Sequence, residues 1–422
     1  MIQPSPPAIA IGIDVGTSGA RAAALSETGE VVAFAAAPFE GADETRTPAA
    51  WWRRVSECLR ALGEQVSLAT VEGLAVDGTS GTVLSIDAAG QPLGVMMYNE
   101  PCSDTTIVER IAAVAPADSP ARGANSGLAR ALHLLSLTPD ACVVHQADWI
   151  ALQLGVADPV TDENNALKTG YDLTDERWPD WIREAGLSPD RLPTVVRAGT
   201  PVGRLGDTGR IFGLSPYCRI HAGTTDGCAS FLATGANRIG DGVTALGSTL
   251  VLKLASAHPV SASKFGIYAH RVLDFWLVGG ASNTGGAVIR ALVGDEKLEE
   301  LTARLDPDIP TGLDYYPLLK PGERFPINDP DYPPRLAPRP SDEAVFFQGL
   351  LEGMTAIEKR GYDLLEELGS GKLRSVRTVG GGARNAVWTC MRQKALGVDF
   401  LPARSVEAAV GTASLVLARR SV

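Results

Sequence analysis

Four short glycine-rich stretches carry the residues that could do chemistry in this chain. Asp14 begins DVGTSG and Asp77 begins DGTSG, GTTD ends at Asp226, and GGGARN begins at Gly380. A glycine-rich turn after a strand exposes several backbone N–H groups in a concave nest, which suits phosphate oxygens. Asp-Gly and Ser-Gly are also ordinary hairpin formers, so one stretch alone leaves both interpretations open. The four together favour a site that handles phosphate.

Asp226 follows an apolar strand and the residues AGTT, and it precedes the start of a helix. A carboxylate there could accept the proton of a substrate hydroxyl as a general base. It could equally cap a helix that begins at Gly227. The residues alone leave the two roles open.

Several other signatures are excluded. GSGK at 369–372 has Glu366 and Leu373 where a P-loop requires Gly and Ser or Thr, so a helix C-cap is the better interpretation. No GxGxxG opens a helix after a strand, and GTSG is not the GxSxG of a hydrolase elbow. The five His are scattered without i, i+4 spacing, which predicts no zinc site; His221, just before GTTD, is the one to watch.

Composition sets the class of protein. A chain of 422 residues predicts two or three domains. The net charge of -11 argues against a nucleic-acid partner, and an anionic substrate must then be met by N–H groups or a cation. Six widely spaced Cys, the lack of a basic leader in residues 1–13 and the lack of an apolar run of about 18 residues predict a reduced, cytoplasmic protein without membrane contact.

The elements that must position these residues repeat in the two halves. Strands expected at 8–13, 20–26 and 31–36 form an antiparallel meander, followed by a helix with Thr47 as N-cap and a strand at 71–76. A second meander is expected from strands at 219–222, 243–254 and 275–278. The region 102–181 is expected to be mostly helical, a proline-rich run at 317–340 to be a loop, and 343–368 and 385–396 to be helices. This pattern predicts an internal duplication.

Five motifs, in this order, resemble those of the FGGY carbohydrate kinases: IGIDVGTSGARAAAL, GLAVDGTSGTVLSID, HAGTTDGCASFLATGA, VTALGSTLVL and VGGGARNAVW. The resemblance covers nearly the whole chain. It implies an α/β fold of two actin-like (ribonuclease H-like) domains, each a mixed sheet with an antiparallel meander flanked by helices, with a cleft between them. It also implies a sugar-binding N-terminal domain at 1–221 and an ATP-binding C-terminal domain at 222–422.

Within that family, QADWIALQL, NNALKTGYD, GLDYYPL and GERFPI are similar to a short xylulokinase-like branch that includes D-ribulose kinases. This implies transfer of phosphate from ATP, with Mg²⁺, to a ketopentose: D-ribulose first, with D-xylulose or an alditol as alternatives. The chain reads MMYNEPCSD where other members have a sugar-contacting Trp-x-Asp-x-Arg segment, which puts the sugar contacts in doubt. The alternative of another class is a non-catalytic actin-fold module that binds ATP. A monomer or a homodimer is expected.

The resemblance also implies roles for single residues. Asp226 would be the catalytic base, Asp14 would lie near Mg²⁺ and the transferred phosphate, and Ser80 would face the sugar. The residues implied to bind substrate are Asp14, Thr17, Ser18, Gly19, Ser80 and Asp226. The residues implied to bind ATP are Gly247, Ser248, Thr249, Gly285, Gly286, Gly381, Gly382, Asn385 and Trp388, with Trp388 against the base.

Overall fold

The computed structural model describes residues 6–420 and divides into two compact units. The first unit holds the chain up to Ala233, then His270–Asp274, and then the chain from Glu407; the second holds Thr234–Ala269 and Phe275–Val406. The domain boundary expected after residue 221 therefore falls inside the first unit. The reason is that α8 (Asp226–Ala233) packs on α13 (Ala408–Arg419), and both helices belong to the first unit.

The first unit contains most of the elements. Its strands are β1 (Ala10–Val15), β2 (Gly19–Leu25), β3 (Val31–Pro38), β4 (Gly73–Gly78), β5 (Val83–Ile86), β6 (Pro92–Met96), β7 (Cys142–His145), β8 (Val160–Asp162), β9 (Thr194–Val196), β10 (Pro201–Arg204), β11 (Arg219–His221) and β14 (His270–Val272). Its helices, besides α8 and α13, are α1 (Pro48–Gln65), α2 (Thr105–Val114), α3 (Gly127–Leu137), α4 (Gln146–Leu154), α5 (Glu163–Leu167), α6 (Trp181–Glu184) and α7 (Asp207–Ile211).

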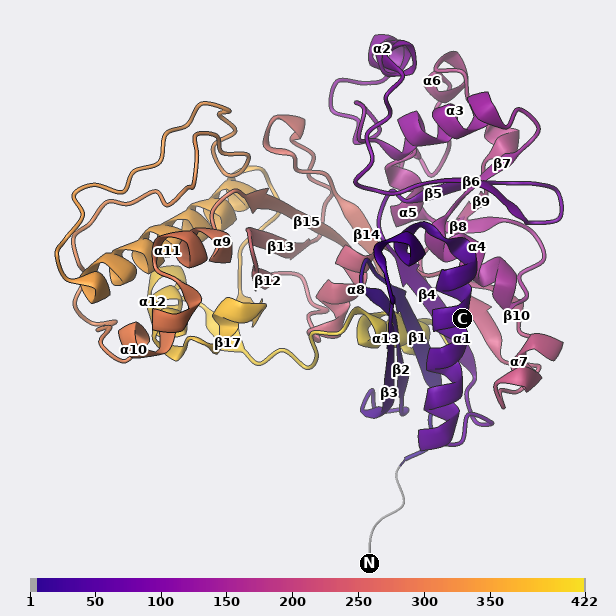
Figure 1. Ribbon diagram of the computed structural model, residues 1–422, viewed down its shortest axis with the longest axis horizontal. Coiled ribbons are helices and arrows are strands. Elements are labelled where there is room, and N and C mark those ends of the chain that lie inside the picture. Colours follow the sequence, from indigo (N-terminus) through magenta and orange to yellow (C-terminus); the bar gives the residue numbers. More distant parts are fainter. Residues whose placement is uncertain (1–5, 421–422) are drawn as a thin grey trace, which may run out of the picture. The chain divides into compact units, whose positions relative to one another are not determined.

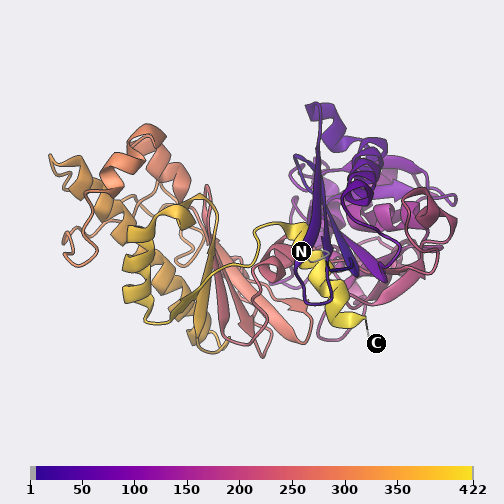
Figure 2. The same cartoon turned by 90° about the horizontal axis from the view of Figure 1, so that it is seen from below.

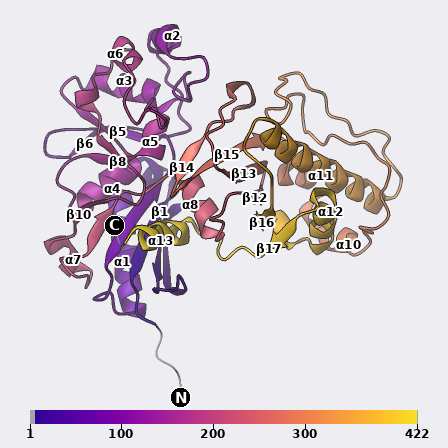
Figure 3. The ribbon, with the colours of Figure 1, turned by 180° about the vertical axis from the view of Figure 1, so that it is seen from behind.

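The main sheet of the first unit has the order β10-β11-β4-β1-β2-β3. Strands β1, β2 and β3 form the expected antiparallel meander, whereas β4 runs parallel to β1 and β11 runs parallel to β4. All six residues of β1 are buried, because helices cover both of its faces. Figure 1 shows α1 along this sheet, and Figure 3 shows α13 lying across β1.

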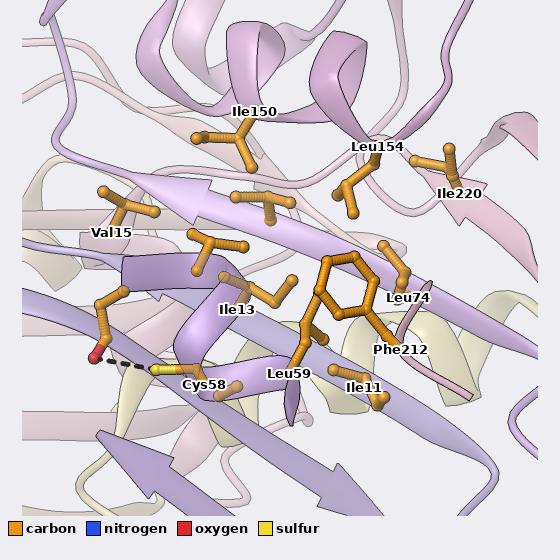
Figure 4. Packing of buried hydrophobic residues seen from close by; sticks show 14 of the residues in the cluster. Ile11, Ile13, Val15, Cys58, Leu59, Leu74, Ile150, Leu154, Phe212 and Ile220 are labelled. Carbon is orange, nitrogen blue, oxygen red and sulfur yellow. Dashed lines mark hydrogen bonds between the residues drawn. The ribbon is translucent and has the colours of Figure 1, made fainter. Parts of the chain in front are cut away.

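The core of the first unit lies between the sheet and α1. Ile11, Ile13 and Val15 alternate along β1 and pack with Leu59 of α1, as Figure 4 shows. The opposite face of β1 meets α13 so closely that a Cβ on Gly12 would lie 2.0 Å from the carbonyl oxygen of Ala409. Gly12 therefore lets the C-terminal helix sit directly on the strand that ends at the candidate site.

The second unit repeats this topology. Its strands are β12 (Asp241–Leu246), β13 (Leu250–Ser256), β15 (Phe275–Ser282), β16 (Ser375–Val379) and β17 (Asp399–Leu401), and its helices are α9 (Gly286–Leu292), α10 (Leu298–Thr302), α11 (Glu343–Glu367) and α12 (Ala386–Leu396). The order β15-β13-β12-β16-β17 again places an antiparallel meander beside two parallel strands. Figure 2 shows this sheet and its helices from a second side. The shared strand order supports the expected internal duplication.

The expected second meander and the expected helical region were both wrong in part. The strand expected at 219–222 is β11 in the sheet of the first unit, and the strand expected at 243–254 is two strands, β12 and β13, which form the meander with β15. The region 102–181 is not mostly helical, because β7 and β8 lie within it and loops separate its short helices. Helix α13 was not expected, although it covers the main sheet of the first unit. Within residues 6–420, no helix is long and apolar enough to cross a membrane.

Candidate active site

The two GTSG motifs begin on neighbouring strands. Because β1 and β4 are parallel and in register, Asp14 stands opposite Asp77, and Val15 stands opposite Gly78. Both carboxylates are buried, with 6% of Asp14 and 0% of Asp77 exposed. The carboxyl ends of these strands thus bring two acidic side chains to one edge of the sheet.

Asp226 joins them from the next segment of the chain. Thr225 forms a parallel bridge with Gly78, so Asp226 begins α8 one residue beyond the edge where the other two carboxylates lie. Gly223 makes this approach possible, because a Cβ there would lie 1.7 Å from the carbonyl oxygen of Val76. The backbone N–H of Gly227 donates to Asp226 Oδ1 over 2.8 Å. Asp226 itself is only half-buried.

Burial dominates the electrostatics of the two inner carboxylates. It raises the pKa of Asp77 well above its usual range, and the nearby charge of Asp14 raises it further. Burial also raises the pKa of Asp14, partly offset by Asp77 and Arg21. Asp77 Oδ1 has no hydrogen-bond partner within the described part of the chain, while a hydrogen bond between the two side chains raises the pKa of Asp77 and lowers that of Asp14. These shifts favour Asp77 over Asp14 as the partner that takes up a proton.

The turn that follows Asp14 contains the other expected residues of this loop. Thr17 and Ser18 are exposed at its tip, and Gly19 begins β2. Arg21 supports the turn from behind: its Nη2 donates to Ser18 Oγ over 3.0 Å, and its Nη1 lies 3.4 Å from Asp14 Oδ2. The guanidinium of Arg21 therefore supplies a fixed positive charge beside the buried carboxylate of Asp14.

The second GTSG turn is held by side chains from other elements. Gln146 Oε1 accepts hydrogen bonds from the backbone N–H and the hydroxyl of Thr79, at 2.9 and 2.8 Å. The Lys168 ammonium lies 3.4 Å from the carbonyl oxygen of Ser80. Ser80 Oγ is buried and has no hydrogen-bond partner within the described part of the chain. A buried hydroxyl without a partner is uncommon, and a ligand hydroxyl is one group that would complete it.

A buried arginine ties this turn to the segment that departs from the family pattern. Arg130 donates to the carbonyl oxygens of Gly81 over 3.0 Å and Glu100 over 2.7 Å, and also to that of Tyr98. Only 1% of Arg130 is exposed. The segment MMYNEP is thus fixed beside the DGTSG turn, in the region where a sugar-contacting segment is expected.

In the second unit, the turn after β12 meets the start of α9. Gly286 N–H donates to the carbonyl oxygen of Gly247 over 2.8 Å, so this amide closes the turn and is not free for a phosphate. Gly285 has φ 140°, and a Cβ there would lie 2.7 Å from the backbone of Thr249. The two glycines therefore act by allowing close packing of the turn and the helix.

A cavity of 860 Å³ opens beside this turn. Its lining contains seven of the nine residues expected to bind ATP: Gly247, Ser248, Gly286, Gly381, Gly382, Asn385 and Trp388. Thr249 and Gly285 do not line it. Its volume is within the usual range of about 300–1,000 Å³ for small-ligand sites.

Two polar residues of the cavity are already engaged. Asn385 caps α12, because its Oδ1 accepts from the N–H of Trp388 while its Nδ2 donates to Thr302 Oγ1. The Trp388 indole donates to Thr355 Oγ1 over 3.0 Å, and only 3% of the residue is exposed. A Cβ on Gly382 would lie 2.7 Å from the Trp388 ring. Trp388 thus forms the floor of the cavity beneath Gly382.

Two family models match the chain. The N-terminal domain of the FGGY family of carbohydrate kinases matches residues 9–116, and the C-terminal domain matches residues 242–418. The chain belongs to the FGGY family of carbohydrate kinases. The fold agrees, since the two-domain structures that match it have the actin-like ATPase architecture.

Individual relatives of this carbohydrate kinase are distant. The xylulose kinase of Escherichia coli is 24% identical over 96% of this chain and 89% of its own length. Among solved structures, the "xyloylose kinase" of Brucella ovis matches with a TM-score of 0.85 at 22% identity, covering 98% of this chain and 90% of its own. The xylulose kinase of Rhodospirillum rubrum matches with a TM-score of 0.81 at 22% identity, over 96% and 88% of the two chains.

Several residues of the sites were missed by the sequence analysis. In the first unit these are Gln146, Lys168 and Arg130, which reach the DGTSG turn from other elements. In the second unit they are Arg290, Asp295, Thr302 and Arg384, which line the cavity. QADWIALQL and NNALKTGYD contain Gln146 and Lys168, so the motifs themselves were a signal, although their partners could not be known.

Within residues 6–420, no group of three or more His, Cys, Asp or Glu side chains is placed to hold a metal ion. The described residues therefore do not supply, beside Asp14, the further protein ligands that a complete metal site would need. Mg²⁺ usually takes only one or two carboxylates and completes its octahedron with waters and substrate phosphates. The orphaned Asp77 Oδ1 and the crowding of Asp14 with Asp77 and Asp226 fit a cation that arrives with its nucleotide.

Proposed function

We propose that this carbohydrate kinase transfers the γ-phosphate of ATP to a hydroxyl of a ketopentose, D-ribulose first and D-xylulose second. The observation that supports this most directly is the bridge between Gly78 and Thr225, since it brings Asp226 beside the DGTSG turn. A general base, a buried unpaired hydroxyl at Ser80 and a cation at Lys168 then surround the same strand ends. The first unit is proposed to bind the sugar and the second to bind ATP.

Asp226 is proposed to accept the proton of the attacking sugar hydroxyl. It is half-buried, so it is accessible to a substrate, whereas Asp14 and Asp77 are enclosed. Its hydrogen bond from Gly227 N–H orients the carboxylate and leaves the other oxygen to act as the base. Phosphoryl transfer needs alignment and charge stabilisation more than covalent catalysis, so one base can suffice.

Asp14 is proposed to hold Mg²⁺ together with the nucleotide phosphates. When bound, the ion would neutralise charge on the transferring phosphate. Arg21 supplies a second positive charge 3.4 Å from Asp14 and fixes the turn of Thr17 and Ser18. The chain's own part in the reaction is thus to hold the phosphate loop and the carboxylate in one place.

The nucleotide is proposed to occupy the 860 Å³ cavity of the second unit. Gly382 packs against the Trp388 ring and Gly381 is open, so the adenine is proposed to lie against these two glycines, with Trp388 behind Gly382; Arg384 and Arg290 bring positive charge to the same cavity. Asn385 is proposed to act there as the helix cap that holds Trp388, because its polar atoms are engaged.

The preference for D-ribulose rests on the branch motifs NNALKTGYD and GERFPI, and the relatives named xylulose kinase support D-xylulose as the alternative. A panel of D-ribulose, D-xylulose, alditols, glycerol and hexoses in a coupled ADP-release assay tests the proposal. We expect the highest kcat/KM with D-ribulose. Activity confined to glycerol or to hexoses would overturn the ketopentose assignment. ADP release that no sugar stimulates would favour the non-catalytic alternative.

A further inference from the structure

A second cavity of the first unit lies away from the candidate active site. It measures 410 Å³ and is lined by the first residues of β1, β4 and β11, by the end of β10 and by the last turns of α13. In the parallel strands β1, β4 and β11, this is the edge opposite the one that carries Asp14 and Asp77. We call it the basal cavity.

Three arginines reach the basal cavity from three different elements. Arg204 ends β10, Arg219 begins β11, and Arg420 follows α13. Glu72 is the one acidic residue among the lining residues that the structure describes. In a chain with a net charge of -11, a concave site with this balance favours an anion.

The geometry of Arg204 suits a phosphate. Its guanidinium lies over the ring of Tyr217, with Cζ 5.9 Å from the ring centroid, which is a cation–π contact. Such a contact does not use up the N–H donors of the guanidinium. Arg420 is oriented by an ion pair with Glu27. Arginine forks match the oxygens of phosphate in a bidentate way, which a bare positive charge does not.

His221, the histidine that precedes GTTD, lies in the wall of the basal cavity. Its Nδ1 is 2.8 Å from the carbonyl oxygen of Gly199, which can only accept, so Nδ1 carries the proton. Burial lowers the pKa of His221, which keeps the ring neutral and makes Nε2 an acceptor. An acceptor beside arginine donors suits a ligand that has both a hydroxyl and a phosphate.

The elements that form the basal cavity also carry the active-site carboxylates. Ala10 and Gly73 line the cavity, and each strand reaches its carboxylate, Asp14 or Asp77, four residues later. At roughly 3.3 Å per residue, this separates the two sites by about 13 Å along each strand. The two strands thus connect the basal cavity directly to the strand ends that carry Asp14 and Asp77.

Other residues that line the basal cavity are also connected to the carboxylates of the candidate active site. His221 pairs with Ala75 on β4, and the chain from His221 reaches Asp226 within five residues. Val416 of the cavity lies one helical turn from Thr412, whose hydroxyl donates to Asp77 Oδ2. All three carboxylates are thus reached by elements that touch the cavity.

We propose that the basal cavity binds a small phosphorylated molecule with free hydroxyl groups, such as a sugar phosphate, and that its occupancy regulates the kinase. The phosphate is held by Arg204 and Arg219, and a hydroxyl is held by His221 Nε2. The apolar side chains of Val416 and Leu417 cover the rest of the ligand. This site is separate from the proposed sugar and ATP sites, and it does not depend on which sugar the enzyme phosphorylates.

Calorimetric titration of the full-length protein with D-ribose 5-phosphate, inorganic phosphate and D-ribose tests the binding. We expect D-ribose 5-phosphate to bind more tightly than inorganic phosphate, and D-ribose not to bind in the cavity. The double variant Arg204→Gln/Arg219→Gln should weaken binding of D-ribose 5-phosphate by about tenfold or more. Both arginines are exposed, so the variant should fold, as a thermal melt would verify.

The matched control is Arg177→Gln/Arg210→Gln, which removes the same charge from exposed positions elsewhere in the first unit. It should bind like the wild type. No binding of D-ribose 5-phosphate, or an equal loss in both double variants, would overturn the site. Equal affinity for inorganic phosphate would overturn recognition of the hydroxyls and leave an anion site.

The regulatory role is tested by measuring kcat/KM with and without D-ribose 5-phosphate. D-ribose 5-phosphate should change kcat/KM of the wild type and of the control, and leave that of Arg204→Gln/Arg219→Gln unchanged, while the three proteins have similar activity without it. Binding without any change in kcat/KM would overturn the regulatory role. An equal change in the double variant would place the effect at the active site instead.

Discussion

The three carboxylates of the first unit differ in how they meet solvent, and this separates their roles. Asp14 and Asp77 are enclosed, so a substrate hydroxyl has little access to either carboxylate. Asp226 begins a helix at the same edge and is half-buried, with one oxygen bound to the next N–H. Accessibility therefore supports the proposal that Asp226, among three residues of the same chemistry, is the base.

Replacing Asp226 with alanine should abolish most transfer without loss of nucleotide binding. We expect Asp226→Ala to lower kcat by on the order of 10²-fold or more, because a positioned general base contributes about that factor. ATP binding, measured by calorimetry, should stay within twofold of the wild type. Asp207→Ala, at an exposed position of α7, is the control and should have normal kcat. Unchanged turnover in Asp226→Ala would show that this carboxylate only supports the start of the helix.

Ser80 offers a test in which stability and function separate. Its hydroxyl is buried without a partner, so Ser80→Ala should leave the free energy of unfolding unchanged within about 0.5 kcal/mol or raise it. If the hydroxyl meets the sugar, KM for the sugar should rise several-fold while KM for ATP stays constant. Ser85 of β5 also has a buried unpaired hydroxyl, and Ser85→Ala should change neither constant. Equal KM values for the sugar in Ser80→Ala and the wild type would contradict the proposed contact.

At the scale of elements, the sequence predicted where the strands end, but it did not predict the side chains that hold the turns after them. Apolar runs that stop at Asp-Gly turns predicted β1 and β4, and their pairing puts the twin GTSG motifs side by side. The hydrogen bonds that hold the second GTSG motif join residues far apart in the chain. Arg130 is 49 residues from Gly81, and Gln146 is 67 residues from Thr79. Local patterns hold no information about such contacts.

Local features of the sequence also explain why three elements were not predicted. Strands β7 and β8 are four and three residues long, too short for an alternating pattern to stand out among neighbouring helices. Helix α13 is buried on nearly every side, so AAVGTASLVLAR has no polar face to reveal a helical period. Its small residues are explained by close contact: a Cβ on Gly411 would lie 1.8 Å from the carbonyl oxygen of Ala229.

Helix α5 provides a prediction about pH, because a buried carboxylate caps it. Asp162 accepts from the N–H groups of Asn164 and Asn165, and burial raises its pKa to about 7, with the charge of Asp148 adding to the effect. The folded state then holds a proton that the unfolded chain releases near pH 4. Through this residue, stability falls as pH rises from about 4 to about 7 and is constant above that range.

Asp162→Asn removes this dependence and keeps a good N-cap. Relative to the variant, the wild type should lose about 2–3 kcal/mol of unfolding free energy between pH 5 and pH 8, because its carboxylate must ionise in a buried site. Urea denaturation at both pH values measures the difference. Asp118→Asn, at an exposed position, should follow the wild type at both pH values. A difference between wild type and Asp162→Asn that is independent of pH would contradict the argument.

At the scale of the whole molecule, the chain leaves the first unit and returns to it at its C-terminal end. Helix α13 lies on β1, β2 and β4, and Thr412 within it donates a hydrogen bond to Asp77, which is 335 residues away. The protonated state and orientation of the buried carboxyl pair thus depend on residues that a division of the sequence into halves would assign to the other domain. The candidate active site of the first unit thus includes a contact with the C-terminal helix.

Thr412→Val keeps the shape of the side chain and removes the donor. Asp77 Oδ2 would then be buried without a partner, so we expect a loss of about 1–3 kcal/mol in the free energy of unfolding. Because Asp77 is hydrogen-bonded to Asp14, the proposed Mg²⁺ ligand, kcat should also fall, even though Thr412 touches no substrate. Thr412→Ser should restore both values, and Ser414→Ala, on the same helix but bonded only to the backbone of Val410, should affect neither. Denaturation curves and ADP-release kinetics of the three variants measure these effects, and a Thr412→Val enzyme with wild-type kcat would show that the C-terminal helix supports the fold without tuning the carboxylates.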